Sequence, residues 1–330
     1  MSSEPIATGG ALPATGRVPD FFVVGHHKSG TTAMYEMLRG HPQIFMPDMK
    51  EPEFFGRDLS RRRGRAPGSD GDRQSFAATR PHTYGEYLSL FAGAGPEQRA
   101  GEASPSYLGS TTAAAQIAAV APQARIIAIL REPASFLRSL HLQMVRNRVQ
   151  DERDLRKAIA AGEVAGGARH SQSYTDRVRY VEQLRRYGEA FSSEQVLALI
   201  YDDFRADNEG TVRRVLRFLD VDHSVAIDAV QANPTVAARS QTLEDLSHAL
   251  RAGRGPLARG TKLAFKTLTP PRMRRGAVRA FQRNVVYASA PPPDEQLMLE
   301  LRRRFRPEVV ALSEYLGRDL VRLWGYDSLG

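Results

Sequence analysis

The sequence predicts an α/β fold in three layers, in which a central, mostly parallel β-sheet is flanked by helices. Two observations support this prediction. Short apolar runs typical of buried strands alternate along the chain with segments whose apolar residues recur at helical spacing. The 330 residues, 42% of them hydrophobic, also suffice for a sizeable core. Strands that alternate with helices form parallel sheets that are covered on both faces.

The first predicted strand follows a stretch of small residues. Residues 1–19 are rich in Gly, Pro, Ala and Ser, so we expect a disordered tail. Residues 21–24 (FFVV) are an apolar run typical of a buried strand, and residues 25–32 form a polar loop. Helical spacing begins at Ala33 and stops at Gly40, where glycine ends the predicted helix.

The rest of the chain repeats this alternation, and we expect residues 20–330 to form a single domain. The polar, arginine-rich residues 57–82 are predicted to be an exposed loop insertion. Strands are predicted at 125–130 (RIIAIL) and 196–201 (VLALIY). Helices are predicted at 111–121, from Pro133 to about Asn147, through Tyr174, Val178, Val181 and Leu184, through Val212, Val215, Leu216 and Leu219, and at 294–316.

The composition excludes several classes of protein. The chain has no cysteine, so we expect no disulfide framework, no thiolate metal site and no cysteine nucleophile. It has no run of about 18 apolar residues, and its first residues lack the basic and apolar regions of a secretory signal. We therefore expect a cytoplasmic protein.

The net charge of +9 has a local source. Residues 251–283 hold ten lysines and arginines and no Asp or Glu, so the rest of the chain is nearly balanced. Residues 251–293, which end in three prolines, are predicted to be a basic flap or lid. Peripheral contact of 251–283 with an anionic membrane, at the inner face, stays open as an alternative.

Residues 21–32 (FFVVGHHKSGTT) predict an anion-binding loop. A strand, a loop bounded by Gly25 and Gly30, and a helix start aim backbone N–H groups and the positive end of a helix dipole at one point. The Walker A pattern G-x-x-x-x-G-K-[ST] has the same two glycines, followed by a lysine. Here Thr31 follows the second glycine, and the lysine is Lys28. The loop therefore predicts a phosphate or sulfate ligand that the lysine approaches from the loop.

A second anion-binding group is predicted where the strand at 125–130 ends. Arg131 follows that strand, and the carboxyl end of a parallel strand faces the crevice in which α/β sheets bind ligands. Its forked guanidinium suits a phosphate. Ser139 lies about two turns into the next helix and can offer a hydroxyl to the same oxygens.

These motifs resemble those of sulfotransferases that use 3′-phosphoadenosine 5′-phosphosulfate (PAPS), in particular the glycan-type and bacterial members. The loop at 25–32 is similar to the family's 5′-phosphosulfate loop. Residues 41–55 contain H-P and then K-E-P-E-F-F, which resembles a second family block. Residues 101–107 (GEASPSY) resemble the block E-[KA]-[ST]-P-x-Y.

The strand-end arginine extends the resemblance. Arg131 and Ser139, with Pro133 between them, have the spacing of the family's 3′-phosphate site. The resemblance covers most of residues 21–222 and returns more weakly near 308–324. It implies a fold like that of P-loop NTPases.

The resemblance implies a reaction and roles for named residues. A sulfonate would pass from PAPS to a hydroxyl or amine of a carbohydrate, a glycolipid or a secondary metabolite, with PAP as product and no metal. Such an in-line transfer depends on positioning and electrostatic stabilisation. Lys28 would stabilise the leaving phosphate, Glu51 falls on the family's catalytic glutamate, and Glu102 is the second candidate base. The implied nucleotide site is His27, Lys28, Ser29, Gly30, Thr31, Thr32, Arg131, Ser139 and Arg239, and the implied acceptor site is His26, Glu53 and Tyr174.

Two other classes of function stay open. A P-loop kinase or NTPase would carry lysine directly before the Thr at the helix start, together with a magnesium site, whereas this chain has Gly30-Thr31-Thr32. A nucleic-acid-binding protein would bind phosphates through residues 251–283, but Phe265 and Phe281 are the only aromatics there, too few for a base-stacking groove. We expect a small-molecule, glycan or lipid acceptor and no specific nucleic acid, and the fold does not name the acceptor.

Overall fold

The computed structural model describes residues 16–56, 58–59, 80–147, 149–164, 173–228, 236–238, 287–289 and 292–329. Most of the predicted insertion at 57–82 lies outside these residues. Arg239 and the whole basic segment 251–283 lie outside them too.

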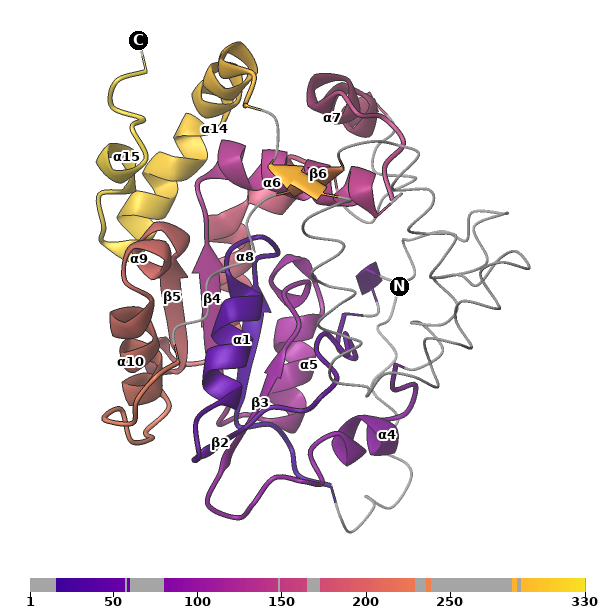
Figure 1. Cartoon of the computed structure of the whole chain (residues 1–330), viewed down its shortest axis with the longest axis vertical. Helices are drawn as coiled ribbons and strands as arrows, with labels where there is room; N and C mark the ends of the chain where they lie inside the picture. The colour runs from indigo at the N-terminus through magenta and orange to yellow at the C-terminus, as the bar shows by residue number, and fades with distance from the viewer. Residues whose placement is uncertain are drawn as a thin grey trace, which may run out of the picture.

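A five-stranded parallel sheet forms the centre of the molecule, in the order β2-β3-β1-β4-β5 (Figure 1). The apolar runs predicted as strands form it because side chains on both faces of a parallel sheet are buried. A separate antiparallel pair joins β6 and β7. The strands are β1 (Phe21–Gly25), β2 (Ile44–Phe45), β3 (Arg99–Ala103), β4 (Arg125–Leu130), β5 (Val196–Ile200), β6 (Val236–Ala238) and β7 (Tyr287–Ser289).

Helices cover both faces of this sheet, which confirms the predicted three-layer α/β class (Figure 1). Alternate side chains of β1 enter two separate cores, as the period of two in a strand requires. Phe21 and Val23 pack with α1, α9 and α10, whereas Phe22 and Val24 pack with α4, α5, α6, α8 and α14. The helices are α1 (Thr31–Arg39), α4 (Tyr84–Ser89), α5 (Ala113–Val120), α6 (Pro133–Arg146), α7 (Leu155–Val164), α8 (Tyr180–Ala190), α9 (Tyr201–Ala206), α10 (Asn208–Phe218), α14 (Glu295–Leu316) and α15 (Leu320–Leu323).

The strand order fixes where a ligand can bind. β1 lies between β3 and β4, so the loops that follow β1 and β4 leave the same edge of the sheet side by side. In open α/β sheets, ligands bind at the carboxyl ends of strands where the order reverses. The two anion-binding segments predicted from sequence, the loop after β1 and Arg131 after β4, therefore meet at this edge.

The structure differs from the sequence prediction at several places: β2, β3, β6, β7, α4 and α7 were not predicted. The predicted helix through Tyr174 begins only at Tyr180, because Ser173 and Asp176 exchange side-chain-to-backbone hydrogen bonds (3.0 and 3.2 Å) that close a separate 3₁₀ turn first. The predicted tail is also ordered at its end. Arg17 donates to the Asp20 carboxylate at 2.8 Å and anchors the chain before β1.

The C-terminal helix α14 packs against α6 and α8 and closes the layer on that face (Figure 1). Asp294 accepts a hydrogen bond from the backbone N–H of Leu297 and caps its start. Gly317, with φ of 60°, ends it in the left-handed conformation that glycine adopts without strain. The predicted helix at 294–316 is confirmed, because its capping signals are local in sequence.

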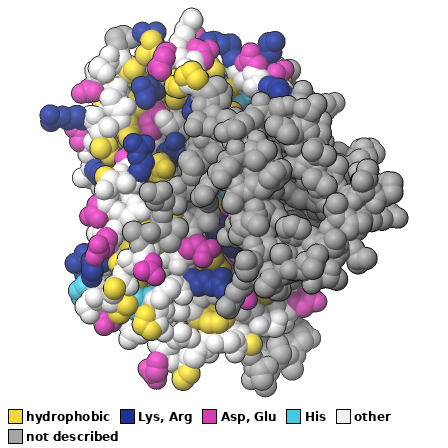
Figure 2. Space-filling view, viewed as in Figure 1, with side chains coloured by type: hydrophobic (Ala, Val, Ile, Leu, Met, Phe, Trp, Pro, Cys, Tyr) yellow, Lys and Arg dark blue, Asp and Glu magenta, His cyan; other side chains and the backbone are white. Residues whose placement is uncertain are grey.

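Lys, Arg, Asp and Glu side chains are interspersed on the described part of the face in Figure 2 and do not gather in one patch. This mixture agrees with the nearly balanced charge of the chain outside residues 251–283. No helix in the described ranges is both long and apolar enough to pass through a bilayer.

Candidate active site

The loop between β1 and α1 leaves the start of α1 open to an anion. Gly30 precedes the helix with φ of 86°, and a Cβ atom there would lie 2.8 Å from the ring of Phe204, so both conformation and space require glycine. No side chain caps α1, and its first turn holds no acidic residue. The first backbone N–H groups and the positive end of the dipole therefore face the site without an internal acceptor.

The side chains of this loop differ in their access to solvent. Ser29 and Thr31 are buried, whereas Thr32 is exposed. The Ser29 hydroxyl lies 3.5 Å from the carbonyl oxygen of His27. The described loop can thus offer backbone N–H groups and the Thr32 hydroxyl to an outside anion most directly.

Lys28 is the cation of this loop. It adopts a left-handed backbone with φ of 63° and is half-buried. Burial, followed by the charges of Arg146 and Arg131, lowers the pKa of Lys28 to about 8. An anion bound beside Lys28 would stabilise its charged form, because the attraction offsets both the cost of burying the charge and the repulsion from the two arginines.

Arg131 joins the two predicted anchors. Its Nη1 donates to the carbonyl oxygen of Lys28 at 2.9 Å, and its guanidinium lies 4.7 Å above the ring of Tyr201 at the start of α9. The Tyr180 hydroxyl donates to the Arg131 carbonyl at 2.9 Å. Two contacts therefore orient the guanidinium, and Tyr180 fixes the backbone of the same residue.

The start of α6, unlike that of α1, is closed by its own acid. Glu132 accepts hydrogen bonds from the backbone N–H groups of Ala134 and Ser135 at 3.0 and 2.7 Å. An anion beside Arg131 must therefore be held by side chains and not by this helix start. Ser139 is buried on α6, and its predicted contact with a phosphate stays a prediction.

The segment after β2 brings two carboxylates toward the loop. Glu51 and Glu53 both have left-handed backbones, with φ of 62° and 53°. Lys50 Nζ lies 2.5 Å from Glu51 Oε1, and Arg80 pairs with Glu53. Burial alone would raise the pKa of Glu51, but His27, Lys50 and Arg80 together lower it. Glu51 is thus an ionised carboxylate at neutral pH.

His27 lies between the loop and these carboxylates. Burial lowers its pKa, and the charges of Glu51 and Glu53 only partly oppose that shift. A neutral imidazole next to a carboxylate can accept or donate a hydrogen bond to a ligand. The structure thus groups Lys28, His27 and Glu51, which were predicted from the sequence to share one site.

His26 and Tyr174 are engaged in the interior. His26 Nε2 lies 2.8 Å from Gln183 Oε1, the ring packs on Phe136, and burial lowers its pKa to about 3, so it is neutral. The Tyr174 hydroxyl lies 2.8 Å from His141 Nδ1, and its side chain is buried. These contacts favour a packing role for both, and their predicted contact with an acceptor stays a prediction.

Glu102 is deeper than the other candidate base. Its side chain has no exposed surface, and its carboxylate accepts from Tyr87 at 2.5 Å and from Ser104 at 2.6 Å. Burial raises the pKa of Glu102 to about 7 against the opposing effect of these hydrogen bonds. The structure therefore places this carboxylate beneath the site and not on its surface.

Three residues near the site were not predicted from the sequence. Arg146, in the last turn of α6, lies close enough to Lys28 to lower its pKa. The charge of Arg177 contributes to lowering the pKa of both His26 and His27. Tyr201 could have been found, because it follows β5 as Arg131 follows β4. Arg146 and Arg177 had no such signal, since arginine on a helix or turn is usually only solvated.

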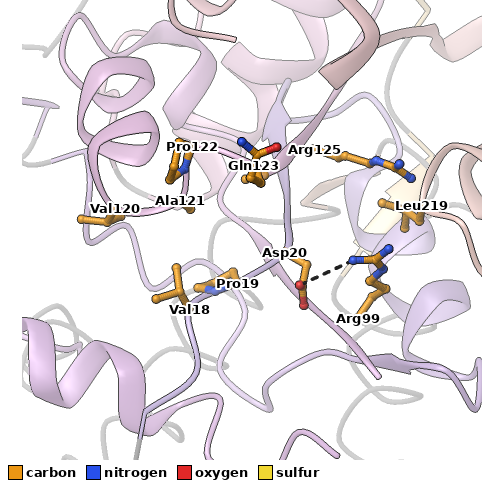
Figure 3. A pocket seen from close by; sticks show the side chains of 11 residues that line it. Val18, Pro19, Asp20, Arg99, Val120, Ala121, Pro122, Gln123, Arg125 and Leu219 are labelled. Atoms are coloured by element: carbon orange, nitrogen blue, oxygen red, sulfur yellow. Dashed lines mark ion pairs between the residues drawn. The ribbon is translucent and has the colours of Figure 1, made fainter. Parts of the chain in front are cut away.

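A pocket of about 400 Å³ lies at the opposite edge of the sheet (Figure 3). Asp20 and Arg99 face each other there at 3.8 Å, and Arg125 lines the same wall. These residues precede or begin β1, β3 and β4, so this pocket is separate from the candidate site. Across the described ranges, no three His, Asp or Glu side chains are grouped to hold a metal ion.

The solved structures and curated proteins that resemble this chain include sulfotransferases. A sulfotransferase from Alicyclobacillus acidocaldarius has a similar fold, with a TM-score of 0.66 and 24% identity over 92% of this chain and 98% of that one. Heparan sulfate glucosamine 3-O-sulfotransferase 3B1 of Mus musculus is 26% identical over 218 residues, 66% of this chain. The bifunctional heparan sulfate N-deacetylase/N-sulfotransferase 1 of Caenorhabditis briggsae is 22% identical over 214 residues, 62% of this chain.

The matches cover a larger share of this chain than of the two heparan sulfate enzymes. The chain spans 50% of the length of the mouse enzyme and 23% of the length of the nematode enzyme. The profile described as the sulfotransferase family matches residues 19–224, which hold β1, the phosphate loop, Glu51, Glu102 and Arg131. Because this match covers more than half of the chain, the protein belongs to the sulfotransferase family.

Proposed function

We propose that this protein transfers a sulfonate group from PAPS to a hydroxyl or amine of a carbohydrate-type acceptor. The hydrogen bond from Arg131 to the Lys28 carbonyl carries the proposal, because it puts two anion-binding groups side by side. PAPS has a phosphosulfate and a 3′-phosphate that need two such groups. Family membership supports the reaction, and the two heparan sulfate enzymes among its relatives support a carbohydrate-type acceptor.

The nucleotide would be held by both segments. The open start of α1 and the Thr32 hydroxyl would bind the 5′-phosphosulfate, and Lys28 would lie at the oxygen that bridges phosphorus and sulfur. Arg131 and Ser139 would bind the 3′-phosphate. Tyr201 supports this role for Arg131, since the ring stacked on the guanidinium keeps it from folding away.

The transfer would proceed in line. Glu51 takes the proton from the acceptor hydroxyl, and the acceptor oxygen forms a bond to sulfur. The bond from sulfur to the bridging oxygen breaks, and its electron pair stays on the phosphate oxygen of PAP, where Lys28 stabilises the charge. The ionised state of Glu51 and its partial exposure (31% of the side chain) support this role over Glu102.

The test is incubation of the purified protein with ³⁵S-labelled PAPS and a panel of unsulfated carbohydrates, including heparosan fragments. Products heavier by one sulfonate, identified by mass spectrometry, are the expected result. ATP with Mg²⁺ is the control substrate for a P-loop kinase. Binding of ATP–Mg²⁺ without binding of PAP would overturn the proposal.

The location of the protein is a separate matter. A cytoplasmic location remains our prediction, and contact of residues 251–283 with an anionic membrane stays open as an alternative to a basic flap; this segment lies outside the described residues. Flotation of the full chain with phosphatidylserine vesicles tests this contact. No flotation at low salt would remove the membrane contact.

A further inference from the structure

The segment that carries Glu51 is held by alternate backbone N–H groups. Those of Glu51, Glu53 and Phe55 donate to the Ala103 carbonyl at 3.1 Å, to the Ser104 hydroxyl at 3.2 Å and to the Tyr107 hydroxyl at 3.2 Å. The spacing of two residues is that of an extended strand. The segment nevertheless turns through two left-handed residues, Glu51 and Glu53, a conformation that persists only where the surroundings fix it.

Two of these three acceptors are hydroxyl groups, which can rotate. A hydroxyl accepts from a backbone N–H reliably only if its own proton is directed elsewhere. The Ser104 hydroxyl donates to Glu102 Oε1 at 2.6 Å, and the Tyr107 side chain also hydrogen-bonds Glu102. One buried carboxylate thus orients both hydroxyls.

We infer that Glu102 is a positioning residue: its carboxylate fixes the Ser104 and Tyr107 hydroxyls, and these hydroxyls hold the segment on which Glu51 faces the site. The catalytic part of this inference rests on the proposed function. Tyr87 completes the arrangement, because its hydroxyl binds the other carboxylate oxygen and its ring stacks on Phe54 at 4.8 Å. The same carboxylate therefore holds the backbone of the segment through Ser104 and Tyr107, and the side chain of Phe54 through Tyr87.

A role for Glu102 as the base itself fits the structure less well. Its side chain has no exposed surface, and three hydroxyls already occupy its two oxygens. An acceptor hydroxyl would have to displace Ser104 or Tyr87 to reach it. Glutamine at this position retains one oxygen that can accept from Ser104, whereas leucine retains none. These two substitutions separate a positioning role from a basic one.

Amide hydrogen exchange measures the positioning directly and needs no turnover. In Glu102→Leu, exchange at Glu53 and Phe55 is expected to rise about tenfold or more, since each loses an oriented acceptor. Ser104→Ala is expected to affect Glu53 alone, and Tyr107→Phe to affect Phe55 alone. Ser104→Ala and Tyr107→Phe replace Glu102→Leu in the experiment if that variant does not fold. The amides of β5 are the internal reference for exchange. Unchanged exchange at both amides in these variants would overturn the inference.

Turnover gives the second readout, as PAP release from PAPS with the acceptor identified above. Glu102→Gln is expected to stay within about tenfold of the parent, whereas Ser104→Ala lowers kcat and leaves the affinity for PAP unchanged. In the Glu102→Gln/Ser104→Ala double variant the two losses are expected to multiply only in part, because one of the two hydroxyls that Glu102 orients is then already absent. A loss in Glu102→Gln as large as in Glu51→Gln, with normal exchange, would make Glu102 the base. If the parent protein turns over no PAPS, the proposed function fails while the exchange result still decides the positioning role.

Discussion

Trp324 donates its indole N–H to the carboxylate of Asp202 at 2.9 Å, across 122 positions of the sequence. Asp202 follows Tyr201, whose ring supports the Arg131 guanidinium. The neighbouring Asp203 is paired with Arg318, which lies just before α15. The C-terminal segment therefore supports the residues around Arg131, where we propose that the nucleotide binds, although it lies outside the part of the chain that the family profile matches.

Trp324 is expected to report nucleotide binding. It is the only tryptophan, so its emission reflects one environment. An anion on Arg131 pulls on the guanidinium and alters the contact with Tyr201, which is joined to Trp324 through Asp202. We expect a saturable change in emission on titration with PAP. Heat of PAP binding in calorimetry without any change in emission would show that the two sites are not connected.

Arg131→Ala is expected to weaken PAP binding about 30-fold to 150-fold, since a charge-assisted hydrogen bond contributes roughly 2–3 kcal/mol. Arg131→Lys should recover only part of this loss, because a point charge cannot reproduce the fork that stacks on Tyr201. Arg138→Ala, on the helix α6 that follows Arg131, is the comparison variant. Calorimetry measures all three, and equal affinities for Arg131→Ala and the parent would exclude Arg131 from the site.

PAP affinity is expected to fall as the pH rises through about 8, the pKa of Lys28 in the free protein. The sign follows from the charge: below this pH Lys28 is a cation that attracts the phosphate, and above it the free side chain is neutral, so binding must take up a proton. The dissociation constant should rise by up to tenfold per unit between pH 8 and 9.5. Lys28→Met should bind weakly with a flat profile, and a flat profile in the parent would contradict the assignment.

Glu51→Gln is expected to lower turnover by about 10²–10⁴ while PAP binding is preserved, because the amide cannot accept the proton of the acceptor. Asp48→Asn is the matched control, since it alters a nearby carboxylate that is 90% exposed and paired with Arg39, outside the site. The assay is release of PAP with the identified acceptor. Near-normal turnover in Glu51→Gln would remove Glu51 from the role of base.

Tyr326→Phe is expected to destabilise the fold by about 1–3 kcal/mol. The buried Tyr326 hydroxyl donates to Glu132 at 2.6 Å, and its removal leaves one oxygen of a buried carboxylate without that donor. Tyr315→Phe, at a side chain that is 42% exposed, is the control and should leave stability unchanged. Urea unfolding gives the free energy of unfolding of each variant. Equal values for Tyr326→Phe and the parent would show that the hydrogen bond does not contribute to stability.

The sequence was sufficient for the features with local signals. The run RIIAIL became β4 with its predicted bounds, and the strand-end rule led to Arg131. β3 was missed because Arg99–Ala103 contains Gly101 and Glu102, two residue types that strands usually avoid. Glutamate is also usually exposed, so its burial beneath the site could not be read from the chain.

Hydrogen bonds between distant segments left no sequence signal at all. Trp324 with Asp202 and Tyr326 with Glu132 are more than 100 positions apart, and no periodicity relates them. The left-handed backbones of Glu51 and Glu53 could not be predicted from the sequence either, since surrounding contacts impose them. Residues of the site that depend on such contacts require a structure.

The packing of α14 on α6 and α8 makes the C-terminal helix part of the core on that face of the sheet. A fragment cut at residue 224, where the family match stops, would keep Lys28, Glu51 and Arg131 but would lose Arg239. It would also strip the cover from an apolar face of both helices, since Phe305, Val309 and Leu312 now fill it. A truncated form for expression, or a domain transferred into another protein, must therefore include the C-terminal helix together with the residues that the family profile matches.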